Sequence, residues 1–251
     1  MHKTLKKKLN FKAFRSTRCQ RLTKEHKIKR KTACKTFLKM GDDWSKNVIW
    51  SVEKWFTLRP HHNRKNDVTW GKVNPHEVVE SKEQGVSKVM AWVGFVNGKF
   101  LPIHWFEGNV DGDQYKSMLE SKVWPAVRRS ASRNRLWFMQ DGARPHTTNE
   151  CLDFLKEKFN NRVISDKLDL FWLPKSPDLD PLDYSVWGNA EKAVFQAKPE
   201  TVEELKKVVE DYLESVSKEE LLRITANFNK RAALCLKVNG GHFEQLLKKK
   251  N

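Results

Sequence analysis

A pair of apolar runs joined by an Asn-Gly dipeptide constrains the fold of this chain most strongly. Residues 87–108 read SKVMAWVGFVNGKFLPIHWFEG, with Asn97-Gly98 between the two runs. Asn-Gly favours a two-residue hairpin turn because both residues accept positive φ angles. The segment therefore predicts an antiparallel β-hairpin.

Apolar patterns on both sides of this hairpin predict further strands and helices. The β-branched and aromatic residues of 48–58 and the short apolar runs at 135–140 and 168–174 predict strands. Amphipathic spacing predicts helices at 112–130, after Thr147 or Thr148, at 181–196, 201–216 and 217–236. The polar stretches 59–87 and 174–183 are interpreted as loops in preference to interfaces. This order predicts an α/β fold, with helices flanking a mixed sheet.

Positive charge is concentrated at the N-terminus. The chain has 48 Lys and Arg against 31 Asp and Glu, a net charge of +17, and residues 1–40 hold 15 of the basic residues but a single acid. This imbalance predicts a polyanionic partner, with nucleic acid as the first candidate. A basic helix beginning near Thr23 is interpreted as a DNA-facing arm rather than a solvated surface helix, because the balancing acids are missing. The side chains expected to contact DNA are Lys6, Lys7, Lys8, Arg15, Arg18, Arg21, Lys27, Lys29, Arg30 and Lys31.

Several classes of protein are excluded by pattern. The sequence has no apolar run of 18 residues and no apolar signal segment, so we expect no membrane association and an intracellular location. The four cysteines form no CxxC pair, and we expect them to be free thiols. No GxGxxG or Walker-type loop is present, so dinucleotide and P-loop chemistry have no support.

Two aspartates lie at the ends of predicted elements, at positions suited to phosphodiester chemistry. Asp141 ends the strand at 135–140, and Asp183 lies three residues after Asp180 at the start of a helix. Converging carboxylates can hold two Mg²⁺ ions about 4 Å apart for phosphodiester cleavage. The alternative is structural: Asp141-Gly142 suits a turn, and Asp180 suits a helix N-cap before Pro181. The residues alone leave both interpretations open.

Two longer motifs resemble the catalytic domain of Tc1/mariner-superfamily transposases. They are WFMQDGARPHTT at 137–148 and LPKSPDLDPLDYSVW at 173–187, and the likeness extends over about 45–240. The resemblance implies an RNase H-like fold and an Asp-Asp-Asp or Asp-Asp-Glu triad that binds two Mg²⁺ ions. It makes Asp141 the second acid and Asp183 the third, both catalytic and metal-binding, with His146 near the site. The spacing between the two aspartates, 41 residues, is similar to that of the branch called rosa.

The first acid of the implied triad is missing. Relatives carry an Asp in a Phe-Ser-Asp-Glu-Lys motif, where this chain reads Trp50-Ser51-Val52-Glu53-Lys54, so Val52 occupies the Asp position. Glu53 is expected on the opposite face of the strand, because side chains alternate. Since an isopropyl group cannot bind Mg²⁺, we expect weak metal binding and poor or no DNA cleavage.

The resemblance also implies a division of the chain into domains and a set of binding partners. Residues 1–44 are expected to be a basic helical arm left from a helix-turn-helix region, as in an N-terminally truncated relative. Residues 45–200 would form the catalytic domain, and 201–251 the C-terminal helices packed on it. The implied activity is cut-and-paste DNA integration, on transposon ends and TA-containing targets, by a nuclear protein that acts as a homodimer. The alternative is a non-catalytic nuclear DNA-binding or scaffold protein, or a decayed element copy.

Overall fold

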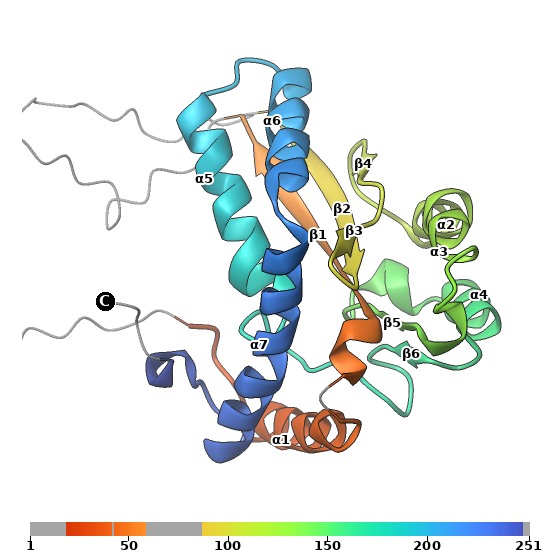
Figure 1. Ribbon diagram of the computed structural model, residues 1–251, viewed down its shortest axis with the longest axis vertical. Helices are drawn as coiled ribbons and strands as arrows, with labels where there is room; N and C mark the ends of the chain where they lie inside the picture. Colours follow the sequence, from red (N-terminus) through yellow and green to blue (C-terminus); the bar gives the residue numbers. More distant parts are fainter. Residues whose placement is uncertain (1–18, 42, 59–86, 248–251) are drawn as a thin grey trace, which may run out of the picture.

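The computed structural model describes residues 19–41, 43–58 and 87–247, and a six-stranded mixed sheet lies at its centre (Figure 1). The strand order is β3-β2-β1-β5-β6, and β4 also pairs with β2. The β2 strand is antiparallel to β1, β3 and β4, whereas β5 is parallel to β1 and β6. The strands are β1 Val48–Thr57, β2 Lys88–Val96, β3 Lys99–Phe100, β4 His104–Phe106, β5 Trp137–Met139 and β6 Val163–Ile164.

Helices cover both faces of this sheet. The α-helices are α1 Lys24–Lys39, α2 Gly112–Met118, α3 Trp124–Val127, α4 Asn149–Phe159, α5 Trp187–Ala197, α6 Val202–Ser215 and α7 Lys218–Lys237. Shorter 3-10 turns lie at Trp44–Asn47, Arg133–Arg135, Arg144–Thr147 and Glu244–Leu246, and π-helical turns at Leu119–Val123 and Leu182–Val186. Figure 1 shows α5, α6 and α7 on one side of the sheet and α2, α3 and α4 on the other. No helix in the described part of the chain has the length and apolar character needed to span a bilayer.

The alternation of side chains along β1 separates two hydrophobic cores. Trp50 and Phe56 pack in the core that also contains residues of α1, α5, α6 and α7. Ile49 packs in the second core, with residues of α2 and α4. The predicted α/β fold, with a mixed sheet flanked by helices, is therefore confirmed.

The predicted hairpin is confirmed. Asn97 and Gly98 connect β2 to β3 with φ angles of 52° and 75°, the left-handed values that this two-residue turn requires. The strand predicted at 48–58 and the helices predicted after Thr148, near 181–196 and in the C-terminal region are confirmed as well. The helix expected over 112–130 forms with a π-helical turn at its centre.

The strand predicted at 168–174 is wrong. The third parallel strand is β6, Val163–Ile164, and the chain then turns, with the Ser165 N–H donating to the Leu170 carbonyl at 3.1 Å. Trp172 and Leu173 are buried in the core without joining the sheet. The apolar run at 168–174 thus reflects side-chain burial in an irregular segment rather than strand pairing.

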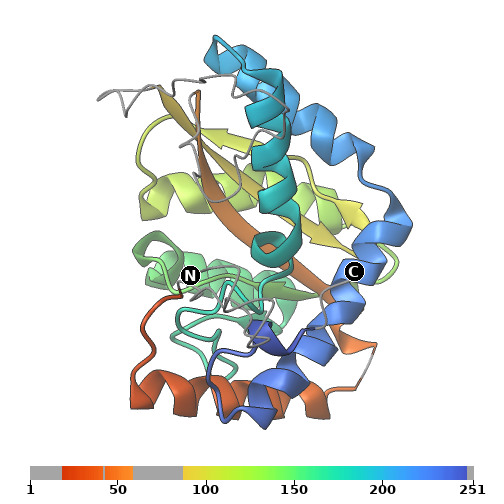
Figure 2. The same cartoon turned by 90° about the vertical axis from the view of Figure 1, so that its left-hand side faces the viewer.

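The basic helix α1 packs against α7, and Figure 2 shows it at the base of the molecule beside the C-terminal part of that helix. Thr23 caps α1 as predicted, accepting from the His26 N–H at 3.2 Å. Phe37 is fully buried, stacks on Trp44 with ring centroids 5.2 Å apart and lies 5.8 Å from Phe228 of α7. One face of the expected arm therefore belongs to the core, while its other face remains exposed.

The close approach of α1 to the end of α7 depends on Gly240. Its φ is +78°, and a β-carbon there would clash with the main-chain carbonyl of Lys27. Gly108 has a similar φ of +82° but open space around it. We expect Gly108→Ala to cost about 1–2 kcal/mol of unfolding free energy from backbone strain. Gly240→Ala should cost about 1–3 kcal/mol more because it also overpacks the contact. Urea unfolding of both variants tests this, and equal losses would contradict the assigned role.

Candidate active site

The parallel register of β1 and β5 sets Asp141 beside Val52. Trp50 lies opposite Met139, the last residue of β5. When this register is continued by two residues beyond the strand, Val52 lies opposite Asp141. The Ser51 hydroxyl donates to the Met139 carbonyl at 2.6 Å and fixes this register at the carboxyl end of β5. Gln140 follows the last residue of β5, and Asp141 comes next, where the chain leaves the sheet.

A pocket of about 480 Å³ opens at this point of the sheet. Val52, Asp141 and Asp183 all line it, so the two acids implied by the motifs and the position of the missing one meet in one place. Asp166 and Asp180 line the same pocket, and neither was proposed as a ligand from sequence. The pocket is therefore strongly acidic, while the catalytic roles of Asp141 and Asp183 stay predictions.

Asp180 caps the helical segment that carries Asp183. Its Oδ1 accepts from the Leu182 N–H at 2.9 Å, and its carbonyl accepts from the Tyr184 N–H. The side chain is almost completely buried, and its Oδ2 has no hydrogen-bond partner among residues 19–41, 43–58 and 87–247. Burial, together with the negative charge of Asp183, holds the pKa of Asp180 well above its usual range.

Asp183 lies in the first turn of this segment and reaches solvent. Protein still surrounds most of its carboxyl group, and this desolvation raises its pKa to about 6, with a further contribution from Asp141. Lys54 of β1 opposes the shift. The Lys54 ammonium also pairs with Glu191 of α5 at 2.8 Å, which holds it between the sheet and that helix.

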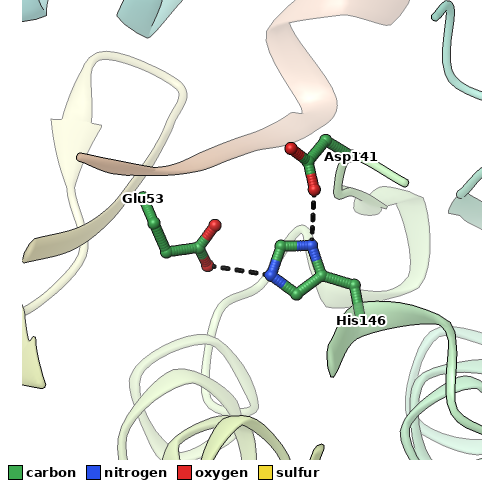
Figure 3. Close-up of side chains that lie close together, drawn as sticks. All are labelled: Glu53, Asp141 and His146. Carbon is green, nitrogen blue, oxygen red and sulfur yellow. Dashed lines mark ion pairs between the residues drawn. The ribbon is translucent and has the colours of Figure 1, made fainter. Parts of the chain in front are cut away.

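On the other side, His146 joins Asp141 to Glu53 (Figure 3). Its Nδ1 lies 2.7 Å from Asp141 Oδ1 and its Nε2 lies 3.2 Å from Glu53 Oε1. Burial alone would lower the pKa of His146, but the charge of Glu53 and the contacts with both carboxylates raise it to about 10. His146 in turn lowers the pKa of Asp141 against the effect of burial. An imidazolium thus bridges the two carboxylates.

Glu53 does face away from Val52, as strand alternation predicts, but it is linked to the site through His146. Glu53, Asp141 and His146 each offer a ligand atom, and these atoms lie within 4.8 Å of one another. A protonated imidazole offers no lone pair, and Mg²⁺ prefers oxygen ligands. Among the described residues, Asp141 contacts His146 and the Ala143 N–H, in each case through Oδ1. Figure 3 shows its other oxygen directed away from the ring, which leaves that oxygen available to a cation.

Arg30 was predicted to contact DNA, and this prediction is wrong. Its guanidinium is fully buried and makes a bidentate ion pair with Asp178, with N–O distances of 2.8 and 2.7 Å. It also donates to the Ser176 hydroxyl at 2.6 Å and to the Gly240 carbonyl at 2.9 Å. Because the guanidinium is buried, it is not accessible to a phosphate at the surface. Helical spacing could have indicated that Arg30 is buried, because it lies on the same face of the helix as the buried residues Ala33 and Phe37.

A second arginine holds the same loop from α7. Arg231 donates to the Asp178 carbonyl at 2.8 Å, and its guanidinium lies 3.9 Å from the centre of the Tyr184 ring. The Tyr184 hydroxyl donates to the Ile224 carbonyl of α7 at 2.6 Å. The loop that precedes Asp180 and Asp183 is thus fixed between α1 and α7.

The other basic residues expected to contact DNA divide into two groups. Arg21, Lys27, Lys29 and Lys31 are exposed, and they remain candidates for phosphate contacts. Lys29 lies 3.6 Å from Glu25, and Lys31 donates to the Asn239 side chain. The remaining candidates lie outside the described residues: Lys6, Lys7, Lys8, Arg15 and Arg18.

A larger pocket of about 950 Å³ lies elsewhere, beside β3, α3 and α6. Its lining is mostly apolar, and Lys99, Glu210 and Glu214 are its charged residues. Converging acids mark the smaller pocket as the better candidate for phosphodiester chemistry.

Solved structures with the same architecture are transposase complexes. The chain matches the Mos1 transposase paired-end complex with left transposon end at a TM-score of 0.82 and 19% identity, covering 95% of this chain and 70% of that one. It matches the catalytic domain of Mos1 mariner transposase at a TM-score of 0.70 and 19% identity, covering 91% of this chain and 100% of that one. The fold is that of a mariner transposase catalytic domain. The chain matches no family model and no curated protein.

Within this transposase fold, removal of one partner of the Arg30–Asp178 pair is expected to be strongly destabilising. Arg30→Ala leaves the Asp178 carboxylate buried without its partner, which should cost about 3–5 kcal/mol of unfolding free energy. Lys35→Ala is the matched control, because Lys35 is an exposed residue of the same helix. It should change stability by no more than about 0.5 kcal/mol. Chemical denaturation measures both, and similar values for the two variants would contradict this prediction.

Proposed function

We propose that this chain is a Tc1/mariner-type, transposase-derived DNA-binding protein whose cleavage activity is impaired at Val52. The observation that carries the proposal is the meeting of Asp141, Asp183 and Val52 in one pocket of a transposase fold. The motifs around the two aspartates support the same assignment. We further propose that it acts on DNA in the nucleus.

The pocket has the chemistry to hold divalent cations. Burial and the charges of Asp183 and Asp141 raise the pKa of Asp180, and burial and Asp141 raise that of Asp183. The buried Asp180 Oδ2 has no hydrogen-bond partner among the described residues, so a cation would relieve an uncompensated negative charge. Asp141 and Asp183 are the residues proposed to hold it. When bound, such ions activate a water molecule and stabilise the leaving oxygen of a phosphodiester. The Mos1 structures support this proposal, since they include a paired-end complex with Mn and another with Mg.

The substitution at the first-acid position limits the chemistry. Val52 supplies no oxygen, and Glu53 on the other face is held by His146. The chain can position a cation between the second and third acids but lacks the first-strand carboxylate of a complete two-ion site. We therefore expect DNA binding to be retained and cleavage to be lost or very slow. This same substitution favours the alternative function, a DNA-binding or scaffold protein without catalysis.

Restoring the missing acid tests the catalytic part of the proposal. Val52→Asp should raise the rate of Mn²⁺-dependent nicking of supercoiled plasmid on the order of 100-fold, because it completes the metal-binding acids. Val52→Asn is the matched control, since it has the same size without the charge. Equal nicking by the unaltered chain would show that the site is not impaired. If Val52→Asp bound DNA and metal but did not nick, the non-catalytic alternative would be favoured.

The exposed lysines of α1 are proposed to contact phosphates without reading sequence. Replacing Lys27 and Lys31 with Ala should weaken DNA binding equally on unrelated duplexes. The slope of log affinity against log salt should fall by about 1 for each lysine. Lys207→Ala is the control, because this exposed lysine of α6 pairs with Asp211 among acidic residues. Fluorescence anisotropy over a salt series measures the slope, and an unchanged slope in the double variant would contradict the proposed contact.

A further inference from the structure

We propose that Asp180 is a metal ligand in this chain and supplies, from the helix side of the pocket, the carboxylate that Val52 no longer provides. The site would bind one Mn²⁺ or Mg²⁺ ion between Asp141, Asp180 and Asp183. This proposal rests on the proposed function and extends it to a residue outside the expected triad.

The geometry of Asp180 carries the inference. The residue is only 2% exposed and lines the same pocket as Asp141, Asp183 and Val52. Its Oδ1 is used to cap the helical segment, but its Oδ2 is buried and has no hydrogen-bond partner in the part of the chain that the structure describes. A buried carboxylate oxygen without a partner is costly, so helix capping alone does not account for the choice of Asp here. An Asn at this position would cap the helix equally well without the charge.

The surrounding charges indicate what the missing partner is. Electrostatic repulsion reaches Asp180 from both Asp183 and Asp141. Lys54 acts on Asp183 but is shared with Glu191, and His146 acts on Asp141 but is shared with Glu53. Lys54 and His146 are thus both already paired with another acid. A divalent ion with oxygen ligands would compensate the three aspartates together.

The position of Asp180 also explains why metal binding and cleavage should separate. Asp180 comes from the loop before α5, whereas Val52 comes from the central strand β1. A carboxylate on the helix side can complete a one-ion site with the two other aspartates. It does not recreate the strand-side ligand, so the two-ion arrangement needed for cleavage remains incomplete. The chain should bind one ion well and still cleave poorly.

The test is a calorimetric titration of the full chain with Mn²⁺ alone. We expect the unaltered chain to bind one ion and Asp180→Asn to bind it at least about tenfold more weakly. Asn retains the Oδ1 cap, so thermal unfolding without metal should show no loss of stability in this variant. Asp169→Asn is the matched control, because it removes an exposed aspartate of a neighbouring segment that does not line the pocket. It should leave Mn²⁺ affinity within about twofold.

A compensating variant makes the test sharper. If Asp180 replaces the missing acid, adding Val52→Asp to Asp180→Asn should restore Mn²⁺ affinity to within about threefold of the unaltered chain, because both positions face the same ion. Adding Val52→Asn instead should restore nothing. Failure of the Asp variant to rescue binding would contradict the shared site.

The remaining outcomes separate this inference from the proposed function. Unchanged affinity in Asp180→Asn, with a tenfold loss in Asp141→Asn, would reduce Asp180 to a helix cap and leave the proposed function standing. Weakening by Glu53→Gln but not by Asp180→Asn would place the ion at the Glu53–Asp141–His146 group and overturn the inference. Absence of Mn²⁺ binding to the unaltered chain below ~10 mM would overturn both the inference and the metal part of the proposed function.

Discussion

The buried ion pair between Arg30 and Asp178 connects the two parts of the chain that matter most for function. It joins the basic helix α1 to the loop that leads into Asp180 and Asp183, and both partners are removed from water. Such a pair contributes little net stability by itself, but loss of one partner leaves a buried charge and is severe. Because Arg231 holds the same loop from α7, the acidic pocket and the N-terminal helix form one structural unit. An isolated basic arm would have no such coupling.

Several negatively charged side chains lie close together in the pocket. Asp141, Asp180 and Asp183 come from different positions around the end of the sheet. The charges of Asp183 and Asp141 add to the effect of burial on the pKa of Asp180, and the charge of Asp141 adds to it on that of Asp183. His146 and Lys54 offset part of this charge at its two sides. The fold tolerates the remainder because Asp183 reaches solvent and Asp180 is stabilised by helix capping. This pattern is typical of a site that binds a cation, and it is present with Val52 at the position where the resemblance implies an acid.

Local signals in the sequence predicted much of the fold. The hairpin at Asn97-Gly98 and the cap at Thr23 depend on residues within a few positions, and both were correct. Motifs singled out Asp141 and Asp183, which line one pocket, while their catalytic roles stay predictions. Strand alternation correctly separated Glu53 from Val52. The strand predicted at 168–174 failed because burial of Trp172 and Leu173 imitates a strand pattern.

Other features could not be predicted because they depend on contacts between distant segments. Arg30 was assigned to DNA by its charge, whereas its partner lies 148 positions away at Asp178. Its place on the apolar stripe of α1 was the one local sign of burial. Asp180 was correctly seen as a helix cap, but its unpartnered Oδ2 becomes visible only when the pocket is assembled. The link from Glu53 through His146 to Asp141 likewise requires the packed structure.

The most direct measurement of the central claim is anomalous diffraction from crystals of the unaltered chain grown with Mn²⁺. We expect one anomalous peak inside the pocket, directly coordinated by carboxylate oxygens of Asp141, Asp180 and Asp183. A peak coordinated by Glu53 and His146 instead, or no peak near Asp141 at saturating Mn²⁺, would contradict it.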